Sequence, residues 1–530
     1  MGMEMVRPPD SVTVHTDTGR IALDKTADGE WGRGDVSVMA RLQGNDLPVK
    51  LAASHSAVMW VHLWWRCELA PGLRILGDAW ERGYGDLEWR GVVPQRPLPW
   101  YFLTYDGSTT DACGVETAAH SFCFWQIDTT GFSLWLDVRC GGCGVQLGNR
   151  TLTAAVVVAR EGSDGETPFE AARAFCKMLC AAPRLPARPV YGGNDWYYAY
   201  GSNSQEQILD DAALIAELAP TGGNRPFMVI DSGWQLGYPG CSGGPWLSNR
   251  KFPNMHRLAS EIRRLTVRPG LWTRPLLTLE GLPESWLLPK KRFTNQPPGN
   301  VMDPTVPDVL AQVADDIRTF TGWGYELIKH DFTTWDLLGK WGFEMGADIT
   351  SPGWHFADRS VTTAEALLGL YRTIREAAGD ALIIGCNTVG HLTAGLHELQ
   401  RTGDDTSGSE WERTRRMGVN TLAFRAPQHE AFFAADADCV GLTNQVPWEM
   451  NWQWLDLLAR SGTALFVSAD PKAVGPQQRT ALKQAFDAAS RPQPVGEPLD
   501  WLDTTCPARW ILNGQRTRFN WFGDEGAWPF

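Results

Sequence analysis

Long apolar runs, a leader-like start and a regular cysteine framework are all missing from this sequence of 530 residues. No stretch approaches the roughly 18 apolar residues that a transmembrane helix needs, and the segment before Pro8 has no apolar core like that of a signal peptide. The 11 cysteines are scattered and odd in number, so they predict no complete disulfide scaffold. We therefore expect a soluble, cytoplasmic protein.

Positive charge is also in deficit. The chain has 48 Lys and Arg against 61 Asp and Glu, and its formal net charge is -13. A chain of this sign repels polyanions, which argues against nucleic acid or an anionic membrane as partner. Cys140 and Cys143 form an isolated pair with no histidine cluster nearby, so we expect neither a metal nor a cofactor. The expected partner is a small molecule, and a homo-oligomer remains open.

Tryptophan, in contrast, is abundant. The chain has 26 Trp and 54 Gly, more than packing alone requires. Flat apolar rings that carry one N–H donor suit the faces of sugars, although most of these rings are expected to fill the core and the contacts between domains. The excess is a first indication of a carbohydrate partner.

The hydrophobic pattern of the sequence differs between the N-terminal third of the chain and the rest. Residues 1–181 carry short alternating strands between Gly and Asp turns and predict a β-sandwich with a connecting helix. The Pro- and Arg-rich stretch 182–189 is typical of a stiff linker. Eight apolar strands alternate with amphipathic helices over 190–472, which predicts an α/β fold, a (β/α)8 TIM barrel. A small C-terminal β element is predicted over 473–530.

The barrel elements can be placed by their patterns. Thr362 and Glu365 form a capping box that predicts the start of a helix over 363–378, and further helices are predicted over 205–218 and 306–321. The strands are predicted at 190–196, 227–231, 268–272, 327–331, 381–386, 399–404, 431–438 and 464–468.

The predicted barrel strands end in polar and aromatic residues. Because the carboxyl ends of the strands carry the active site in such barrels, we expect these residues to form one cup. The cup would hold acidic groups, a few cations and aromatic walls. Its members include Asp195, Trp196, Asp231, Ser232, Trp272, Arg274, Lys329, Asp331, Cys386, Asn387, Arg401, Asp404, Asp405, Asp436 and Asp438.

Two carboxylates on opposite sides of a cup are what glycoside cleavage requires. One attacks or stabilises the anomeric carbon, and the other protonates the leaving oxygen. Asp331 ends a strand in Leu327-Ile-Lys-His-Asp331-Phe, and Asp405 follows another in Arg401-Thr-Gly-Asp-Asp405-Thr.

These segments resemble glycoside hydrolase family 36, a family of retaining α-glycosidases related to families 27 and 31. The first is similar to the nucleophile strand and the second to the Arg-x-Gly-x-Asp-Thr acid/base segment of that family. The likeness covers roughly residues 190–470 and implies a barrel behind a β-sandwich. Further matching segments are Val229-Ile-Asp231-Ser232-Gly-Trp234, Gly270-Leu-Trp272-Thr-Arg274-Pro, Ile384-Gly-Cys386 and Asp436-Ala-Asp438-Cys439.

The resemblance implies a role for each matching residue. Asp331 would be the nucleophile, and Asp405 the general acid and then the base. A family 31-like reading of Thr-Gly-Asp with Trp411 would give the acid role to Asp404 instead. Substrate would be bound by Trp196 and Trp272 as walls, Asp231 and Ser232 at the far end, Lys329 and Arg401 on hydroxyls, and Cys386 and Asn387 near the 2-hydroxyl.

Two expectations concern the surroundings of these residues. The charge of Asp331 and a partly dry pocket should keep Asp405 protonated before the ester forms. Trp80 and Glu81, on a sandwich loop, are expected to reach over the cup.

Two departures from the family pattern bear on the substrate. The paired Asp-Asp of galactose-specific members is Asp231-Ser232 here, and Arg274 stands where the family has a small residue. Together they favour an acidic or bulkier substituent at C5 or C2, unless Arg274 turns away and pairs with Glu280 or another carboxylate.

The prediction for function is a retaining glycosidase that cleaves terminal α-linked sugars, with α-galactosides as the family default. The alternatives are a transglycosylase of the raffinose synthase type and an α-glycosidase for an anionic or N-acetylated sugar. A third alternative is a sugar-binding protein with a dead barrel, which the presence of both Asp331 and Asp405 disfavours.

Overall fold

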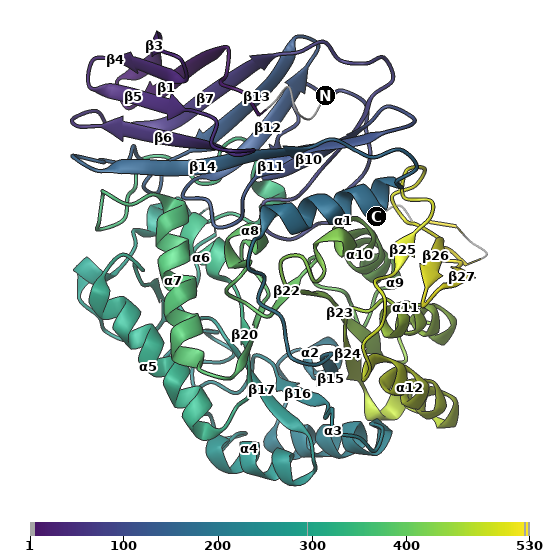
Figure 1. Cartoon of the computed structure of the whole chain (residues 1–530). Coiled ribbons are helices and arrows are strands. Elements are labelled where there is room, and N and C mark those ends of the chain that lie inside the picture. Colours follow the sequence, from purple (N-terminus) through teal and green to yellow (C-terminus); the bar gives the residue numbers. More distant parts are fainter. Residues whose placement is uncertain (1–5, 294, 524–525, 528–530) are drawn as a thin grey trace.

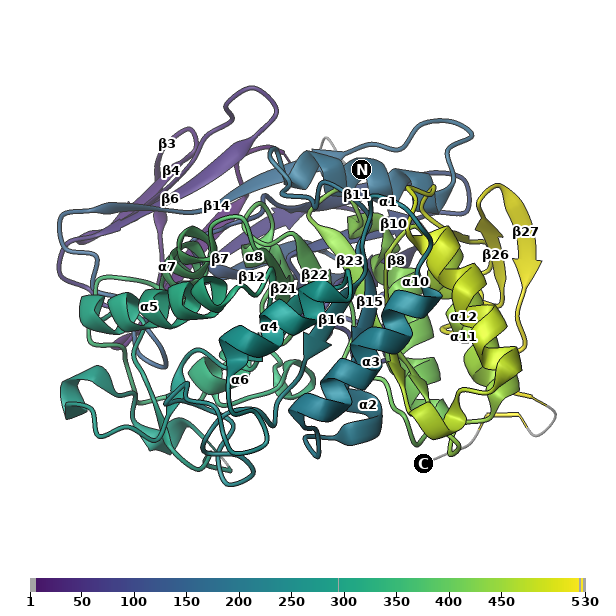
Figure 2. The ribbon, with the colours of Figure 1, turned by 90° about the horizontal axis from the view of Figure 1, so that it is seen from below.

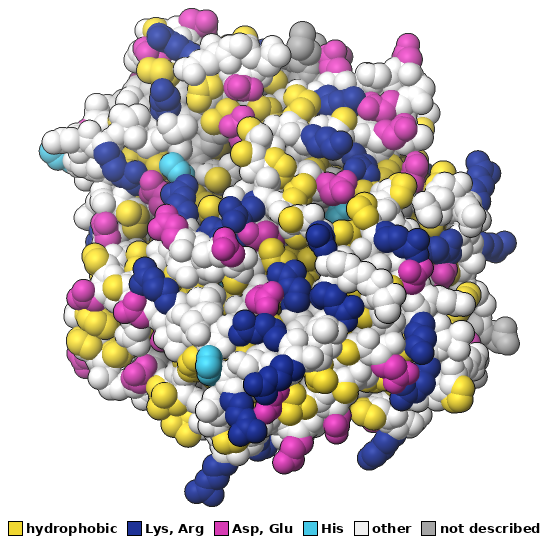
Figure 3. Space-filling view, turned by 60° about the horizontal axis from the view of Figure 1, so that its bottom comes forward, with side chains coloured by type: hydrophobic (Ala, Val, Ile, Leu, Met, Phe, Trp, Pro, Cys, Tyr) yellow, Lys and Arg dark blue, Asp and Glu magenta, His cyan; other side chains and the backbone are white. Residues whose placement is uncertain are grey.

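The computed structural model describes residues 6–293, 295–523 and 526–527. A β-rich N-terminal domain lies across the top of a helix-surrounded barrel in Figure 1, and a small C-terminal sheet lies at the side of the barrel. On the face shown in Figure 3, acidic and basic side chains are intermingled.

The N-terminal domain contains two antiparallel sheets. Side chains in strands such as β5 (Val36–Ala40) alternate between buried and more exposed positions, because successive residues of a strand point to opposite faces. The first sheet, in spatial order, contains β2 (Gly19–Ala22), β1 (Ser11–Thr16), β7 (Val58–Arg66), β13 (Gly131–Asp137), β12 (Phe122–Asp128) and β9 (Leu98–Pro99). The second contains β3 (Asp24–Ala27), β4 (Glu30–Arg33), β5, β6 (Leu47–Ala53), β14 (Thr151–Arg160), β11 (Thr110–Val115), β10 (Tyr101–Tyr105) and β8 (Arg74–Gly77).

The barrel is a closed ring of eight parallel strands, which confirms the predicted (β/α)8 fold. Its strands are buried almost throughout, since helices cover the outside and side chains fill the inside. In order they are β15 (Tyr191–Asn194), β16 (Phe227–Ile230), β17 (Arg268–Thr273), β20 (Leu327–His330), β21 (Leu382–Gly385), β22 (Leu399–Arg401), β23 (Ala434–Leu442) and β24 (Ala464–Ala469).

Helices surround these strands (Figure 2). Two helices, α3 (Gln205–Leu218) and α7 (Thr363–Ala378), have the bounds predicted from sequence, and the capping box at Thr362 is present. The predicted helix over 306–321 runs further, as α5 (Pro307–Trp323), until Gly324 ends it with a φ of 100°. The other helices are α1 (Pro168–Leu179), α2 (Trp196–Ala199), α4 (Met255–Arg264), α6 (Thr333–Leu338), α8 (Gly390–Thr393), α9 (Trp411–Thr414), α10 (Thr421–Arg425), α11 (Trp448–Arg460) and α12 (Pro476–Ala489).

Helix α12 belongs to the barrel. It packs against β15, β24 and α11, so the predicted boundary after residue 472 falls between the last strand and the helix that follows it. The C-terminal sheet is three-stranded, with β25 (Glu497–Pro498), β26 (Arg509–Leu512) and β27 (Gln515–Arg518). Two short strands, β18 (Leu277–Thr278) and β19 (Asn300–Val301), pair outside the barrel ring.

A loop of the sandwich, residues 78–87, enters the mouth of the barrel. The N–H of Gly83 donates to the carbonyl of Thr402 at 2.8 Å, and the N–H of Asp404 donates to the carbonyl of Gly83 at 2.9 Å. A Cβ on Gly83 would lie 2.8 Å from a methyl of Thr421, so glycine permits this close approach. The sandwich loop is therefore joined to the end of β22.

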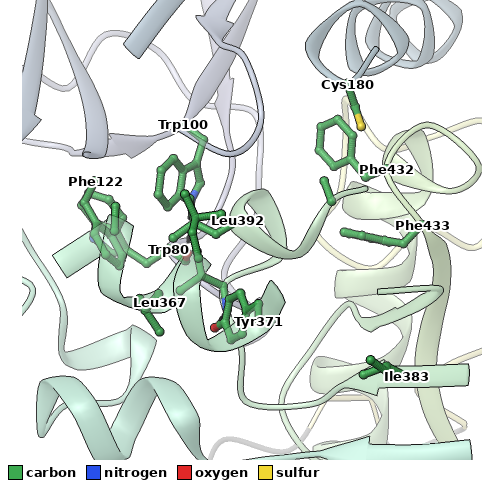
Figure 4. Close-up of a cluster of buried hydrophobic side chains, with 14 of the residues drawn as sticks. Trp80, Trp100, Phe122, Cys180, Leu367, Tyr371, Ile383, Leu392, Phe432 and Phe433 are labelled. Atoms are coloured by element: carbon green, nitrogen blue, oxygen red, sulfur yellow. Dashed lines mark hydrogen bonds between the residues drawn. The ribbon is translucent and has the colours of Figure 1, made fainter. Parts of the chain in front are cut away.

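Trp80 lies in the apolar contact between the two domains. Figure 4 shows it with Trp100 and Phe122 of the sandwich, beside Leu392 and Tyr371 of the barrel. Its indole N–H donates to the carbonyl of Gly346 at 3.1 Å, and the side chain is 4% exposed. The expectation that Trp80 reaches over the cup is wrong, because its ring fills the core of this contact.

All eleven cysteines lie in the described part of the chain and are free thiols. Among the described residues, no helix has the length and apolar character needed to cross a bilayer. The same residues contain no group of three or more metal-ligating side chains.

Candidate active site

A pocket of about 290 Å³ opens where several barrel strands end. It brings together seven of the fifteen residues named as members of the predicted cup. Those lining it are Trp196, Asp231, Ser232, Trp272, Lys329, Asp331 and Asp405, together with Tyr238, Pro239, Gly240, Cys241, Ser242, Pro298 and Phe332. Four predicted site residues are not part of this lining. Three of them contact lining residues, namely Arg274 with Ser242, Asn387 with Asp331 and Arg401 with Asp405, whereas Cys386 contacts Arg401.

Asp331 follows directly on β20, and three N–H donors orient its carboxylate. One oxygen accepts from the backbone of Phe332 at 2.7 Å and of Asn387 at 3.1 Å, and the other accepts from the indole of Trp272 at 2.9 Å. Phe332 adopts a φ of 63°, a conformation that bulky residues rarely take and that often marks a functional site. The carboxylate is thereby held in one orientation at the pocket wall.

The far end of the pocket contains a buried ion pair. The ammonium of Lys329 lies 2.6 Å from Asp231, which also accepts from the amide of Asn194 at 2.8 Å. Burial lowers the pKa of Lys329, but Asp231 and the weaker effects of Cys386 and Asp331 together raise it above its ordinary value, so Lys329 stays charged. Asp195 lies behind this pair and accepts the N–H of Asp231 at 2.7 Å. Burial, and then the charge of Asp231, raises the pKa of Asp195 to about 7.

Asp405 reaches the pocket from the segment after β22, and its side chain is 38% exposed. Arg401 lies 3.3 Å from one carboxylate oxygen and Arg82 lies 3.8 Å from it. Burial raises the pKa of Asp405, but Arg401, Arg82 and Lys329 lower it more, so the net pKa is below its ordinary value. The expectation that Asp405 is kept protonated is therefore wrong, because guanidinium groups surround it.

Asp404 is held away from the pocket lining. Its carboxylate binds Arg82 at 2.7 Å and Arg413 at 2.9 Å, one on each oxygen. The side chain is 16% exposed. Of the two neighbouring carboxylates, Asp405 therefore has access to the pocket.

Arg82 is a site residue that the sequence analysis missed. It stands on the sandwich loop, is almost fully buried, and joins Asp404 and Asp405 from another domain. The adjacent Glu81, which was expected near the cup, is buried and accepts hydrogen bonds from the amide of Asn387 and the backbone of Gly342. Burial raises the pKa of Glu81. The only signal for Arg82 was its place beside Glu81.

Cys386 and Arg401 lie against the segment that carries Asp405. A guanidinium nitrogen of Arg401 lies 3.3 Å from the sulfur of Cys386, and another lies 2.8 Å from Asp438. Burial raises the pKa of the Cys386 thiol, so it stays neutral. Asp438 also accepts the N–H of Thr406 at 2.8 Å and so fixes the residue that follows Asp405.

Comparison with known proteins identifies solved structures with a similar fold. No protein-family model matches the chain, and no curated protein matches it by sequence. TtGalA, an α-galactosidase from Thermus thermophilus, has a TM-score of 0.62 and 17% identity over 96% of this chain and 99% of its own. AgaA, a family 36 α-galactosidase from Geobacillus stearothermophilus, has a TM-score of 0.59 and 15% identity over 90% of this chain and 75% of its own. The chain has the family 36 α-galactosidase fold.

Within this fold, Arg274 is held by a buried carboxylate. Two guanidinium nitrogens bind Asp336 of α6 at 2.9 and 2.5 Å, and the third binds the hydroxyl of Ser242 at 2.9 Å. The guanidinium also lies over the ring of Phe332, 4.1 Å from its centroid. The partner is therefore Asp336 and not Glu280. Because Asp336 neutralises Arg274, the expected gain of a free cation near the pocket is wrong, and Ser232 remains as the departure in the lining.

The Arg274–Asp336 pair generates a test of stability. We expect Arg274→Met to destabilise the protein by about 3 to 5 kcal/mol, because it leaves Asp336 buried without its partner. The double variant Arg274→Met with Asp336→Leu should recover part of that loss. Denaturant unfolding measures both.

Arg318→Met is the matched control, since Arg318 pairs with Asp315 on an exposed helix surface and should contribute little. A single Arg274 variant as stable as this control, or a double variant less stable than the single one, would contradict the assignment.

Proposed function

We propose that the protein is a retaining α-glycosidase that hydrolyses terminal α-galactosides. The observation that carries the proposal is that Asp331 and Asp405 line one pocket at the strand ends of a family 36-type barrel. TtGalA and AgaA, which share the fold, are both described as α-galactosidases.

The geometry supports a division of work between the two carboxylates. The three N–H donors on Asp331 aim its oxygens without giving it a proton, as a nucleophile requires. The side chain of Asp405 is 38% exposed and lies among cations that can stabilise its carboxylate after the first step.

The reaction would run in two steps. An oxygen of Asp331 forms a bond to the anomeric carbon while the bond to the leaving oxygen breaks, and Asp405 gives its proton to that oxygen. Water then attacks the glycosyl ester and gives a proton back to Asp405, and Asp331 departs as a carboxylate. Trp196 and Trp272 would pack against the sugar, while Asp231 and Lys329 would bind its hydroxyls.

The first test measures hydrolysis of p-nitrophenyl α-D-galactopyranoside and the anomer formed first, by NMR. We expect α-galactose as the initial product, and loss of nearly all turnover in Asp331→Ala. Azide should partly restore that variant and yield the β-galactosyl azide, because the small anion occupies the space of the missing carboxylate. An added sugar acceptor shows in the same assay whether transfer competes with hydrolysis.

Asp405→Ala and Asp404→Ala form a matched pair. On a galactoside with a poor leaving group, the Asp405 variant should lose about 10²- to 10⁴-fold in rate and the Asp404 variant much less. Selective loss in the Asp404 variant would move the acid role one residue upstream, and full activity of Asp331→Ala would remove that residue as nucleophile.

The second test concerns pH. A general acid works only when protonated, so kcat/KM falls as pH rises through the pKa of Asp405. Because Arg401 and Arg82 lower this pKa, we expect activity to decline already in the acid range. Arg82→Ala removes one of these cations, so the alkaline limb of the pH profile should move to higher pH.

Arg413→Ala serves as its control, because Arg413 binds Asp404 and is 39% exposed. Its alkaline limb should move less than that of Arg82→Ala. An unmoved limb in Arg82→Ala would show that another group sets the alkaline decline.

A further inference from the structure

We propose that Trp341, extended outward by Phe343, forms a platform that binds the flat face of the leaving group, an aryl ring or a second pyranose. The proposal rests on the proposed glycosidase function and assigns the side of the pocket where the leaving group departs.

Ring contacts join Trp341 to one neighbour of each of the two proposed catalytic carboxylates. Its ring packs on Phe332, which lines the pocket next to Asp331, with ring centroids 5.6 Å apart. On another side the guanidinium of Arg82 lies 5.6 Å from the Trp341 ring centroid. Arg82 in turn binds Asp404 and approaches Asp405. Trp341 thus lies between the neighbour of the nucleophile and the partner of the acid, where a leaving group protonated by Asp405 would be found.

The platform is apolar, and both of its residues are at least partly exposed to solvent. Trp341 is half-buried and stacks on Trp335 with centroids 5.4 Å apart and an interplanar angle of 22°. Phe343 is 62% exposed, and its ring meets the edge of Tyr84 with centroids 5.0 Å apart. Trp335 covers one face of the Trp341 indole, and the ring surface that stays exposed is suited to the C–H face of a sugar or to an aromatic ring.

Both domains hold the platform in place. The N–H of Gly342 donates to Glu81 at 2.9 Å, and the N–H of Trp341 donates to Glu344 at 2.8 Å. A Cβ on Gly342 would lie 2.7 Å from the Tyr84 ring, so only glycine lets this segment pack so closely against the sandwich loop. Because this surface is already ordered before binding, little conformational entropy is lost when the ligand binds.

The chemistry of the platform selects leaving groups that contain a ring. A stacking contact made equally in the ground state and in the transition state lowers KM and leaves kcat unchanged. Loss of the contact should therefore raise KM for ring-bearing leaving groups. A methyl leaving group is too small to cover the indole and should be little affected.

The test compares phenyl and methyl α-galactosides as substrates of the full-length chain. In Trp341→Ala, kcat/KM for the phenyl galactoside should fall about tenfold through KM, which corresponds to about 1.4 kcal/mol. The methyl galactoside should lose far less. Trp341→Phe keeps a ring and should recover part of the loss, and Phe343→Ala should show a smaller loss in the same direction.

Trp452→Ala is the matched control, because Trp452 is a 47% exposed tryptophan on α11. It should leave both substrates unchanged. Equal losses on the two galactosides in Trp341→Ala, a loss confined to kcat, or no loss on either would overturn the platform. Failure of the wild-type chain to cleave either galactoside would instead count against the proposed function.

Discussion

Buried cations at the barrel mouth must each be matched by a carboxylate, and the rest of the site depends on this pairing. Moving one charge out of water costs several kcal/mol unless a partner and further hydrogen bonds compensate it. The pairs fix the side chains that surround the pocket and leave Asp331 and Asp405 facing into it. They are Lys329 with Asp231, Arg401 with Asp438, Arg82 with Asp404 and Arg274 with Asp336.

One of these cations, Arg82, comes from the sandwich, so the two domains meet at the site. The loop that carries Arg82 pairs its backbone with the end of β22 at Gly83, and Arg425 binds both Asp78 and the carbonyl of Glu81 within the same contact. The loop also holds the segment that carries Trp341. The site is therefore a product of both domains, and its electrostatics belong to neither alone.

The sequence was informative wherever a local pattern has a physical cause. Barrel strands are apolar because both of their faces are covered, and their polar ends mark the mouth. Helix α7 begins where Thr362 and Glu365 form a capping box, so its start was predicted to the residue. The same patterns identified seven of the fourteen residues that line the pocket.

Local sequence patterns could not predict the tertiary contacts of the site. Asp336 lies on the short helix α6, which has no periodic signal, so nothing local identified it as the partner of Arg274. Arg82 and Trp341 belong to loops of different domains that meet only in the folded protein. The pKa of Asp405 was predicted in the wrong direction because the prediction considered burial and Asp331 but not the charge of Arg401, and because Arg82 was not placed near it.

The most direct measurement of the central claim is to trap the covalent intermediate. A fluorinated α-galactosyl fluoride that forms a slowly hydrolysed ester should inactivate the protein with one sugar bound per chain, and peptide mass spectrometry should find that sugar on Asp331. A label on another carboxylate would contradict the account, and so would rapid turnover of the reagent by a chain in which Asp331 is replaced by Ala.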